Sequence, residues 1–233
     1  MNTAEQEAGP PLRVGGFTPF TTIDYPGELS AVVYLQGCPW RCRYCHNGGL
    51  LDAGIEPELA WTSVMGTLHE RSGLLDAVVF SGGEPCAQAG LVDAVRQVRA
   101  LGFRVGLHTA GCYPQRLARL MPLLDWVGLD IKALPEDYPA LTGVAGSGQR
   151  AFDSLRLLRG SRVSHEVRVT VHGQLLDRSR LHRLLALLQE QGVDEPVLQR
   201  CREAAMFDEA LGANPVRWPD QDRCSPAQWR EVQ

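Results

Sequence analysis

Residues 31–47, AVVYLQGCPWRCRYCHN, join a short apolar run to a loop that contains three cysteines. The run over residues 31–35 is apolar on both faces and ends at a polar residue and a glycine, so it predicts a buried β-strand. Five further runs rich in valine and leucine have the same character. They cover residues 77–80, 104–107, 126–129, 166–171 and 196–198.

Segments with helical periodicity lie between the predicted strands. Apolar residues recur every three or four positions in three of them, at Trp61, Val64 and Leu68, at Leu91, Val95 and Val98, and at Leu181, Leu184, Leu185 and Leu188. The alternation of strand and helix favours right-handed βαβ crossovers and a parallel sheet, either doubly wound or closed into a barrel. Six units fall short of the eight in a complete barrel of roughly 250 residues, so we expect an α/β fold with a partial, laterally open TIM-like barrel.

The predicted elements divide the chain into three parts. Residues 28–201 contain all six predicted strands and form the barrel. Residues 1–27 are expected to be an N-terminal extension that packs on the barrel, because residues 13–27 are rich in Gly, Thr and Pro. Residues 202–233 show little periodicity and are expected to be a C-terminal tail.

Composition limits the possible functions. The 233 residues carry a formal net charge of -4, and 44% of them are hydrophobic, so the chain can bury a core but offers no broad positive surface to nucleic acid. It has no apolar run long enough for a signal peptide or a membrane span, which favours a cytoplasmic location without membrane attachment. Of the 23 basic residues only Lys132 is a lysine, so any role that needs a compact ammonium falls to that position.

Three of the seven cysteines, Cys38, Cys42 and Cys45, are separated by three and then two residues. In a reducing compartment such a cluster favours metal binding, and sulfur ligands select zinc, copper(I) or an iron–sulfur cluster. A structural zinc ion needs a fourth ligand, for which only the adjacent His46 is near. A [4Fe-4S] cluster held by three cysteines leaves one iron free for a substrate or cofactor, so we favour the cluster and keep zinc as the alternative. The other four cysteines, Cys86, Cys112, Cys201 and Cys224, lie far apart in the sequence and lack the short spacing of a ligand loop.

Three more polar turns follow predicted strands. They are SGGEP over residues 81–85, HTAG over residues 108–111 and GLDIK over residues 128–132. All lie at the C-terminal ends of strands, where αβ barrels build active sites. On the fifth strand Glu166, Arg168 and Thr170 share one face, and an inward-facing arginine needs an anionic partner, either a ligand or Glu166 itself.

The cysteine spacing, with aromatic Tyr44 before Cys45, resembles the signature of the radical S-adenosylmethionine (SAM) superfamily. The resemblance implies a partial (β/α)6 barrel with a [4Fe-4S] cluster and SAM as cofactors. It also implies that the Gly-Gly-Glu-Pro loop holds the amino group of SAM and that Lys132 pairs with its carboxylate. The implied cofactor-binding residues are Tyr44, Gly82, Gly83, Glu84, Pro85, Thr109, Asp130, Lys132 and Arg168.

Some relatives with an Asp-x-Lys after the same strand hold a monovalent cation beside the cofactor. The groups that bind this cation match Thr109 and Asp130. His108 stands where those relatives carry an aspartate, which argues against a cation here.

Longer stretches resemble the activating enzymes of glycyl radical proteins. Residues 107–114, 125–132 and 166–172 are most similar to the family called anaerobic ribonucleoside-triphosphate reductase activating protein, and the likeness covers residues 13–202. It implies that an electron donor such as flavodoxin or ferredoxin drives cleavage of SAM, and that the resulting radical takes a hydrogen from a glycine of the partner reductase. Asp24, within GFTPFTTIDYPG over residues 16–27, matches an aspartate near that glycine and is the expected substrate-facing residue.

Two alternatives remain open on the sequence. An activating enzyme of another glycyl radical protein, such as pyruvate formate-lyase, shares every motif and differs only in its partner. A zinc-stabilised binding protein without redox chemistry would use the same three cysteines for structure alone.

Overall fold

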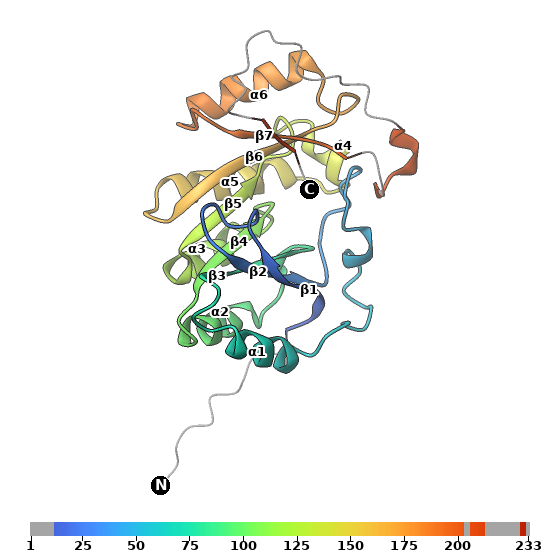
Figure 1. Ribbon diagram of the computed structural model, residues 1–233. Coiled ribbons are helices and arrows are strands. Elements are labelled where there is room, and N and C mark those ends of the chain that lie inside the picture. Colours follow the sequence, from blue (N-terminus) through green and yellow to red (C-terminus); the bar gives the residue numbers. More distant parts are fainter. Residues whose placement is uncertain (1–11, 203–205, 213–228, 232–233) are drawn as a thin grey trace.

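The computed structural model describes residues 12–202, 206–212 and 229–231. Its strands form one eight-stranded sheet in the order β1 to β8 (Figure 1). β1 (Val14–Thr21) is antiparallel to β2, and the remaining neighbours are parallel. The other strands are β2 (Ser30–Leu35), β3 (Ala77–Gly82), β4 (Arg104–Thr109), β5 (Trp126–Asp130), β6 (Ser164–Val171), β7 (Val197–Arg200) and β8 (Trp229–Glu231).

Helices connect the parallel strands and cover the outside of the sheet (Figure 1). The α-helices are α1 (Trp61–Glu70), α2 (Leu91–Ala100), α3 (Pro114–Leu120), α4 (Tyr138–Thr142), α5 (Ser147–Arg159) and α6 (Arg178–Glu190). Single turns of 3-10 helix occur at η1 (Gly48–Leu50), η2 (Pro85–Ala87), η3 (Met121–Leu123) and η4 (Glu209–Leu211). Every helix and strand expected from periodicity is present, and the order of strands leaves β1 and β8 at open edges, which confirms the laterally open partial barrel.

The two outer strands lie in the segments expected to be an extension and a tail. β1 belongs to residues 1–27, and it is hydrogen-bonded along β2 with irregular register. β8 belongs to residues 202–233 and pairs with β7. Both segments therefore contribute strands to the sheet, in addition to any packing on its surface.

The outer core is built by the apolar stripes of the helices. Val64 and Leu68 of α1 are buried, as are the expected apolar residues of α2 and three residues, Leu181, Leu184 and Leu188, of α6. They pack with outward-facing strand residues such as Val33 in one continuous cluster. Their burial drives the helices onto the sheet, since each such side chain contributes about 1.5–3 kcal/mol when removed from water.

The inner face of the sheet has a separate aromatic floor. Tyr25, Val32, Ala77, Val79 and Trp126 form this second buried cluster, in which the rings of Tyr25 and Trp126 lie 5.3 Å apart. Glycines make room for it. A Cβ at position 106 would lie 3.0 Å from Tyr25, and one at position 128 would lie 2.9 Å from Trp126. Above this floor, the next inward-facing residues of each strand are free to line a pocket.

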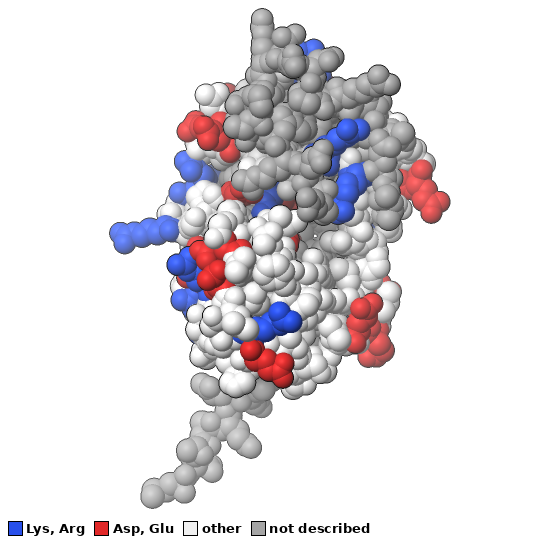
Figure 2. Space-filling view, viewed as in Figure 1, with Lys and Arg blue, Asp and Glu red and all other residues white. Residues whose placement is uncertain are grey.

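Figure 2 shows acidic and basic side chains interspersed on one face of the molecule, among a majority of uncharged residues. Within the described part of the chain, no helix combines the length and apolar character needed to cross a membrane.

Close packing at Gly148, in the first turn of α5, gives a test of the fold. A Cβ there would lie 2.3 Å from the carbonyl oxygen of Pro135, whereas the helical Gly66 of α1 has nothing within 4 Å. We expect Gly148→Ala to lower the free energy of unfolding by about 1–3 kcal/mol through overpacking. The matched control Gly66→Ala should raise it by about 0.5–1 kcal/mol, because alanine is the better helix former. Urea denaturation measures both, and equal stability of the two variants would contradict the packing described.

Candidate functional site

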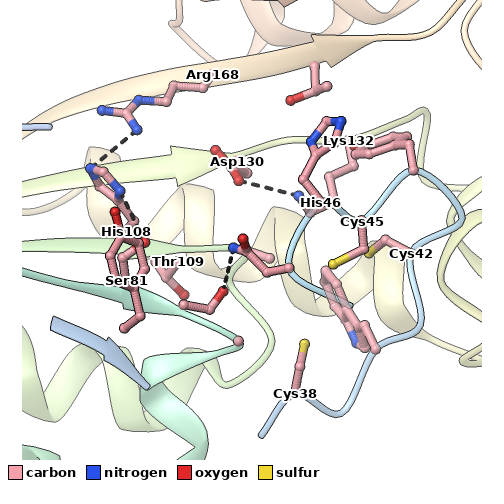
Figure 3. Close-up of a pocket in the computed structure, with 18 of the residues that line it drawn as sticks. Cys38, Cys42, Cys45, His46, Ser81, His108, Thr109, Asp130, Lys132 and Arg168 are labelled. Atoms are coloured by element: carbon pink, nitrogen blue, oxygen red, sulfur yellow. Dashed lines mark hydrogen bonds and ion pairs between the residues drawn. The ribbon is translucent and has the colours of Figure 1, made fainter. Parts of the chain in front are cut away.

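A pocket of about 610 Å³ opens at the C-terminal ends of the parallel strands. It is lined by the cysteine loop on one side and by the ends of β3 to β7 on the other. Figure 3 shows Cys42, Cys45, His46 and Lys132 on one wall, Arg168, His108 and Ser81 on the opposite wall, and Asp130 between them. The pocket lies directly above the aromatic floor, because Tyr34 and Ser81 in its lining follow the floor residues Val32 and Val79 by two positions along their strands.

All three cysteines of the loop face this pocket. The loop is irregular backbone fixed by hydrogen bonds to other segments, such as the one from the Cys38 amide to the Leu51 carbonyl at 3.1 Å. Burial raises the pKa of the Cys42 thiol to about 12 and also raises the pKa of Cys45, whereas a hydrogen bond with Cys112 lowers the pKa of Cys38. A metal centre bound here would therefore displace protons from buried thiols.

His46 is the residue that would have to serve as the fourth ligand of a structural zinc ion. Its Nε2 lies 2.9 Å from the carbonyl oxygen of Arg202, which can only accept, so Nε2 carries the proton and donates it. Within the described residues, no group of three or more His, Cys, Asp and Glu side chains has the arrangement needed for a metal ion. The three thiols all line the pocket, as suits ligands that bind different irons of one cluster.

The Gly-Gly-Glu-Pro loop packs its two glycines tightly against the end of β2 and the start of the cysteine loop. A Cβ on Gly82, which has φ +108°, would lie 2.3 Å from the Leu35 amide nitrogen, and one on Gly83 would lie 2.4 Å from the Gly37 carbonyl oxygen. Both glycines line the pocket, but Glu84 and Pro85 are buried behind it. The glycines are therefore required for the contact between the two loops.

Glu84 joins the β3 loop to the β4 loop. Its carboxylate accepts hydrogen bonds from the Thr109 hydroxyl at 2.7 Å, the Ala110 amide at 3.0 Å and the Cys86 amide at 3.1 Å. The Thr109 hydroxyl also accepts from the Gly111 amide at 3.0 Å. Burial raises the pKa of Glu84, although these donors oppose the rise. The structure thus places Glu84 as a support of the pocket wall, while Thr109 lines the pocket.

Lys132 is a buried cation beside Asp130. Its Nζ lies 3.3 Å from the Asp130 carboxylate and 5.6 Å from the centre of the Tyr44 ring, and 12% of its side chain is exposed. Burial opposes its charge, but Tyr44, Asp130 and other acidic groups raise its pKa well above the ordinary value. Burial also raises the pKa of the Tyr44 phenol, and the Asp130 carboxylate is the ion-pair partner of the ammonium.

Arg168 lies across the pocket from Lys132. Its Nε forms an ion pair with Glu166 at 2.9 Å, as one of the two sequence interpretations expects, and its guanidinium lies 5.0 Å above the Trp126 ring. The side chain nevertheless lines the pocket and is 10% exposed. Arg168 can therefore keep its ion pair with Glu166 and still contact a ligand in the pocket.

His108 is a central residue that the sequence analysis considered only in relation to a cation. Its Nδ1 lies 3.3 Å from the Ser81 hydroxyl, and its Nε2 lies 2.9 Å from the Asp24 carbonyl oxygen and 3.2 Å from Arg168 Nη1. Asp24 itself lines the pocket, and its carboxylate accepts a hydrogen bond from Thr21. Burial first, and the charge of Arg168 second, lower the pKa of His108 to about 4, so the imidazole is neutral near pH 7.

Two buried donors in the pocket wall have no hydrogen-bond partner among the described residues. They are Trp40 Nε1 and the Tyr44 hydroxyl, and both side chains line the pocket. Buried polar groups are almost always hydrogen-bonded, so these two suit a pocket whose occupant carries acceptor atoms. Together with three thiols and two buried cations, they make a donor set that fits an iron–sulfur cluster and an anionic small molecule.

Comparison with known proteins identifies the family. The model of the radical SAM superfamily matches residues 32–187. The chain belongs to the radical SAM superfamily. It is therefore a radical SAM enzyme, whose cofactors are a [4Fe-4S] cluster and SAM, as expected from the cysteine spacing.

Three relatives illustrate how far the similarity extends. A Methanocaldococcus jannaschii protein, named as a glycyl-radical enzyme activating enzyme, is 28% identical and covers 87% of this chain and 85% of its own. The pyruvate formate-lyase 1-activating enzyme of Escherichia coli is 29% identical over 79% of this chain and 78% of its own. The structure of Streptococcus suis SuiB bound to SAM has a TM-score of 0.59 and 14% identity over 74% of this chain and 40% of that protein, which supports the fold alone.

The radical SAM pocket contains residues that the sequence analysis did not select. Ser81, His108 and Thr170 follow from the alternation of each strand once its inner face is known. Gln199 and Arg202, at the end of β7, lie beyond the expected strand over residues 196–198 and carry no motif.

The lowered pKa of His108 predicts a pH dependence of stability. The unfolded chain takes up a proton near pH 6.5, but the folded protein resists it until about pH 4, so stability falls as pH drops between those values. From pH 7 to pH 5 the metal-free protein should lose about 1–2 kcal/mol more than His108→Gln, measured by urea denaturation. His69→Gln, at an exposed position of α1, should keep the wild-type dependence. Identical slopes for the wild type and His108→Gln would contradict this assignment.

Proposed function

We propose that this radical SAM enzyme is an activating enzyme that generates a glycyl radical on anaerobic ribonucleoside-triphosphate reductase in the cytoplasm. The activase class is supported by the names of the two relatives that resemble most of the chain. The choice of reductase rests on residues 107–114, 125–132 and 166–172, which are most similar to the reductase-activating family. The single observation that carries the proposal is the convergence of three thiols and two buried cations on one pocket.

The pocket residues support roles in binding both cofactors. When bound, the cluster and SAM supply one-electron cleavage of the sulfonium bond and a 5'-deoxyadenosyl radical, with flavodoxin or ferredoxin as the proposed donor. Cys38, Cys42 and Cys45 would each bind one iron. Trp40 and Tyr44 offer their unpartnered buried donors to the occupants of the pocket.

The charged residues of the pocket would orient SAM. Lys132 is the compact cation for its carboxylate, and Arg168 adds a second positive group from the opposite wall. Gly82 and Gly83 have no side chain, so their backbone would contact the ligand directly. Glu84 and Pro85 are buried behind the pocket wall and would hold this loop in place. Thr109 and Asp130 complete the wall between the two cations.

Asp24 is the proposed contact to the partner's glycine. It lies in the loop after β1, lines the pocket and is joined through its carbonyl to His108. Since β1 is an edge strand, a glycine-bearing segment of the reductase can approach beside it. The radical would then take a hydrogen atom from the glycine α-carbon, which leaves 5'-deoxyadenosine and a glycyl radical.

Lys132→Arg tests the SAM-binding assignment. The guanidinium is a broad planar fork, and it cannot occupy the buried position of the ammonium between Asp130 and Tyr44 without displacing them. We expect about a tenfold loss of SAM affinity by equilibrium dialysis, with iron and sulfide content unchanged. Wild-type affinity in this variant would show that the lysine does not select SAM.

Radical transfer is tested with candidate partners. Reduced, reconstituted protein should cleave SAM to 5'-deoxyadenosine and produce a glycyl radical signal in electron paramagnetic resonance when mixed with the reductase. Cys42→Ala should lose both cluster and cleavage, whereas Cys86→Ala, at a buried cysteine outside the pocket lining, should retain them. Protein purified without oxygen that contains one zinc, no iron and no sulfide would refute the function. If the glycyl radical signal appeared only with pyruvate formate-lyase, the protein would still be an activating enzyme, but its partner would be pyruvate formate-lyase.

A further inference from the structure

The segment that follows β7 returns to the cysteine loop and bonds to its backbone. The Phe207 amide donates to the Cys45 carbonyl at 3.0 Å, and the Asp208 amide donates to the Arg43 carbonyl at 2.9 Å. The Asp208 carboxylate also forms an ion pair with Arg43 Nε at 2.7 Å. We call residues 206–208 the loop strap.

The opposite edge of the same loop is bonded to the end of α4. The Arg41 amide donates to the Thr142 carbonyl at 2.9 Å, and the Arg43 amide donates to the Leu141 carbonyl at 3.1 Å. Arg43 is therefore hydrogen-bonded through its amide on one side and its carbonyl on the other. The loop residues between Cys42 and Cys45 lie between two segments that are about 65 residues apart in sequence.

Side chains extend the attachment beyond Cys45. His46 Nε2 donates to the Arg202 carbonyl and lies 3.7 Å from Cys201 Sγ, which lies 3.9 Å from Met206 Sδ. Cys201 is itself anchored, because its amide donates to the Val171 carbonyl at the end of β6. The strap is thus connected to the sheet on one side and to the cysteine loop on the other.

We propose that the loop strap keeps Cys42 and Cys45 in position to bind the cluster, with Asp208 as a positioning residue. An irregular loop needs external partners for its backbone groups, and the strap supplies those of the Arg43 and Cys45 carbonyls. Without the strap these two carbonyls lose their hydrogen-bond partners, and the chain between Cys42 and Cys45 gains freedom. This inference rests on the proposed ligand set, and it assigns to the segment after β7, within the expected C-terminal tail, a role in retaining the cluster.

Phe207→Pro and Phe207→Ala separate the backbone bond from the side chain. Proline has no amide hydrogen, so it removes the bond to the Cys45 carbonyl, whereas alanine keeps that donor. In the full-length reconstituted protein without oxygen, the cluster should be lost to an iron chelator about fivefold faster in Phe207→Pro than in Phe207→Ala, followed by visible absorbance. Equal rates in the two variants would overturn the proposal.

A second pair of variants tests Asp208 without disturbing the backbone. Asp208→Asn keeps the oxygen that caps the Ala210 amide but removes the charge that pairs with Arg43. Its control is Asp177→Asn, because Asp177 also caps a helix and pairs with an arginine, at the start of α6. We expect cluster loss about two- to threefold faster in Asp208→Asn only, and equal rates in this pair would refute the role of Asp208.

The thiols of the metal-free protein give a readout that needs no cluster. Alkylation of Cys45 should be about fivefold faster in Phe207→Pro than in Phe207→Ala, because the loop opens more often once this bond is gone. If wild-type protein binds no cluster, the proposed function fails, but this measurement still tests the strap. If the wild type binds a cluster and both Phe207 variants match in alkylation and in cluster loss, the strap fails and the function stands.

Discussion

The backbone of the cysteine loop needs hydrogen-bond partners that the loop cannot provide. After β2 ends at Leu35 the chain leaves the sheet, so its amides and carbonyls must be satisfied by other segments. They are supplied by Leu51, by the end of α4 and by the segment after β7. Three cysteines placed closely in sequence thus depend for their positions on three separate segments of the chain.

The short helix α4 contacts both the cysteine loop and the segment that carries Lys132. Its C-terminal carbonyls bind the cysteine loop, while the hydroxyl of Tyr138 accepts a hydrogen bond from the Lys132 amide at 2.9 Å. The Tyr138 ring also packs edge-on against Trp40, 5.7 Å away. The proposed cluster ligands and the proposed SAM-binding lysine are therefore positioned by one five-residue helix, whose local sequence carries no motif.

How much of the structure could be predicted from the sequence depends on how far apart in the chain the interacting residues lie. The six parallel strands could be predicted because burial on both faces leaves a local apolar run, and the cysteine and Asp-x-Lys motifs could be found because their spacing is local. β1 could not be predicted as a strand from VGGFTPFT, which lacks such a run, since its place depends on backbone pairing with β2. His108 and Asp208 have partners 60 and 165 residues away in sequence, so their contacts left no local pattern.

The aromatic floor of the barrel supports residues that line the pocket above it. Trp126 and Tyr25 fill the interior at the level where the inward residues are small, including glycines at positions 106 and 128. Two positions after these glycines, the same inward direction carries His108 and Asp130. Trp126 supports both Arg168 and the neutral imidazole of His108, whose ring lies 5.5 Å away. Because that imidazole carries no charge near pH 7, it adds no charge to the pocket, and the two cations that line it, Arg168 and Lys132, keep the carboxylates of Glu166 and Asp130 as their partners.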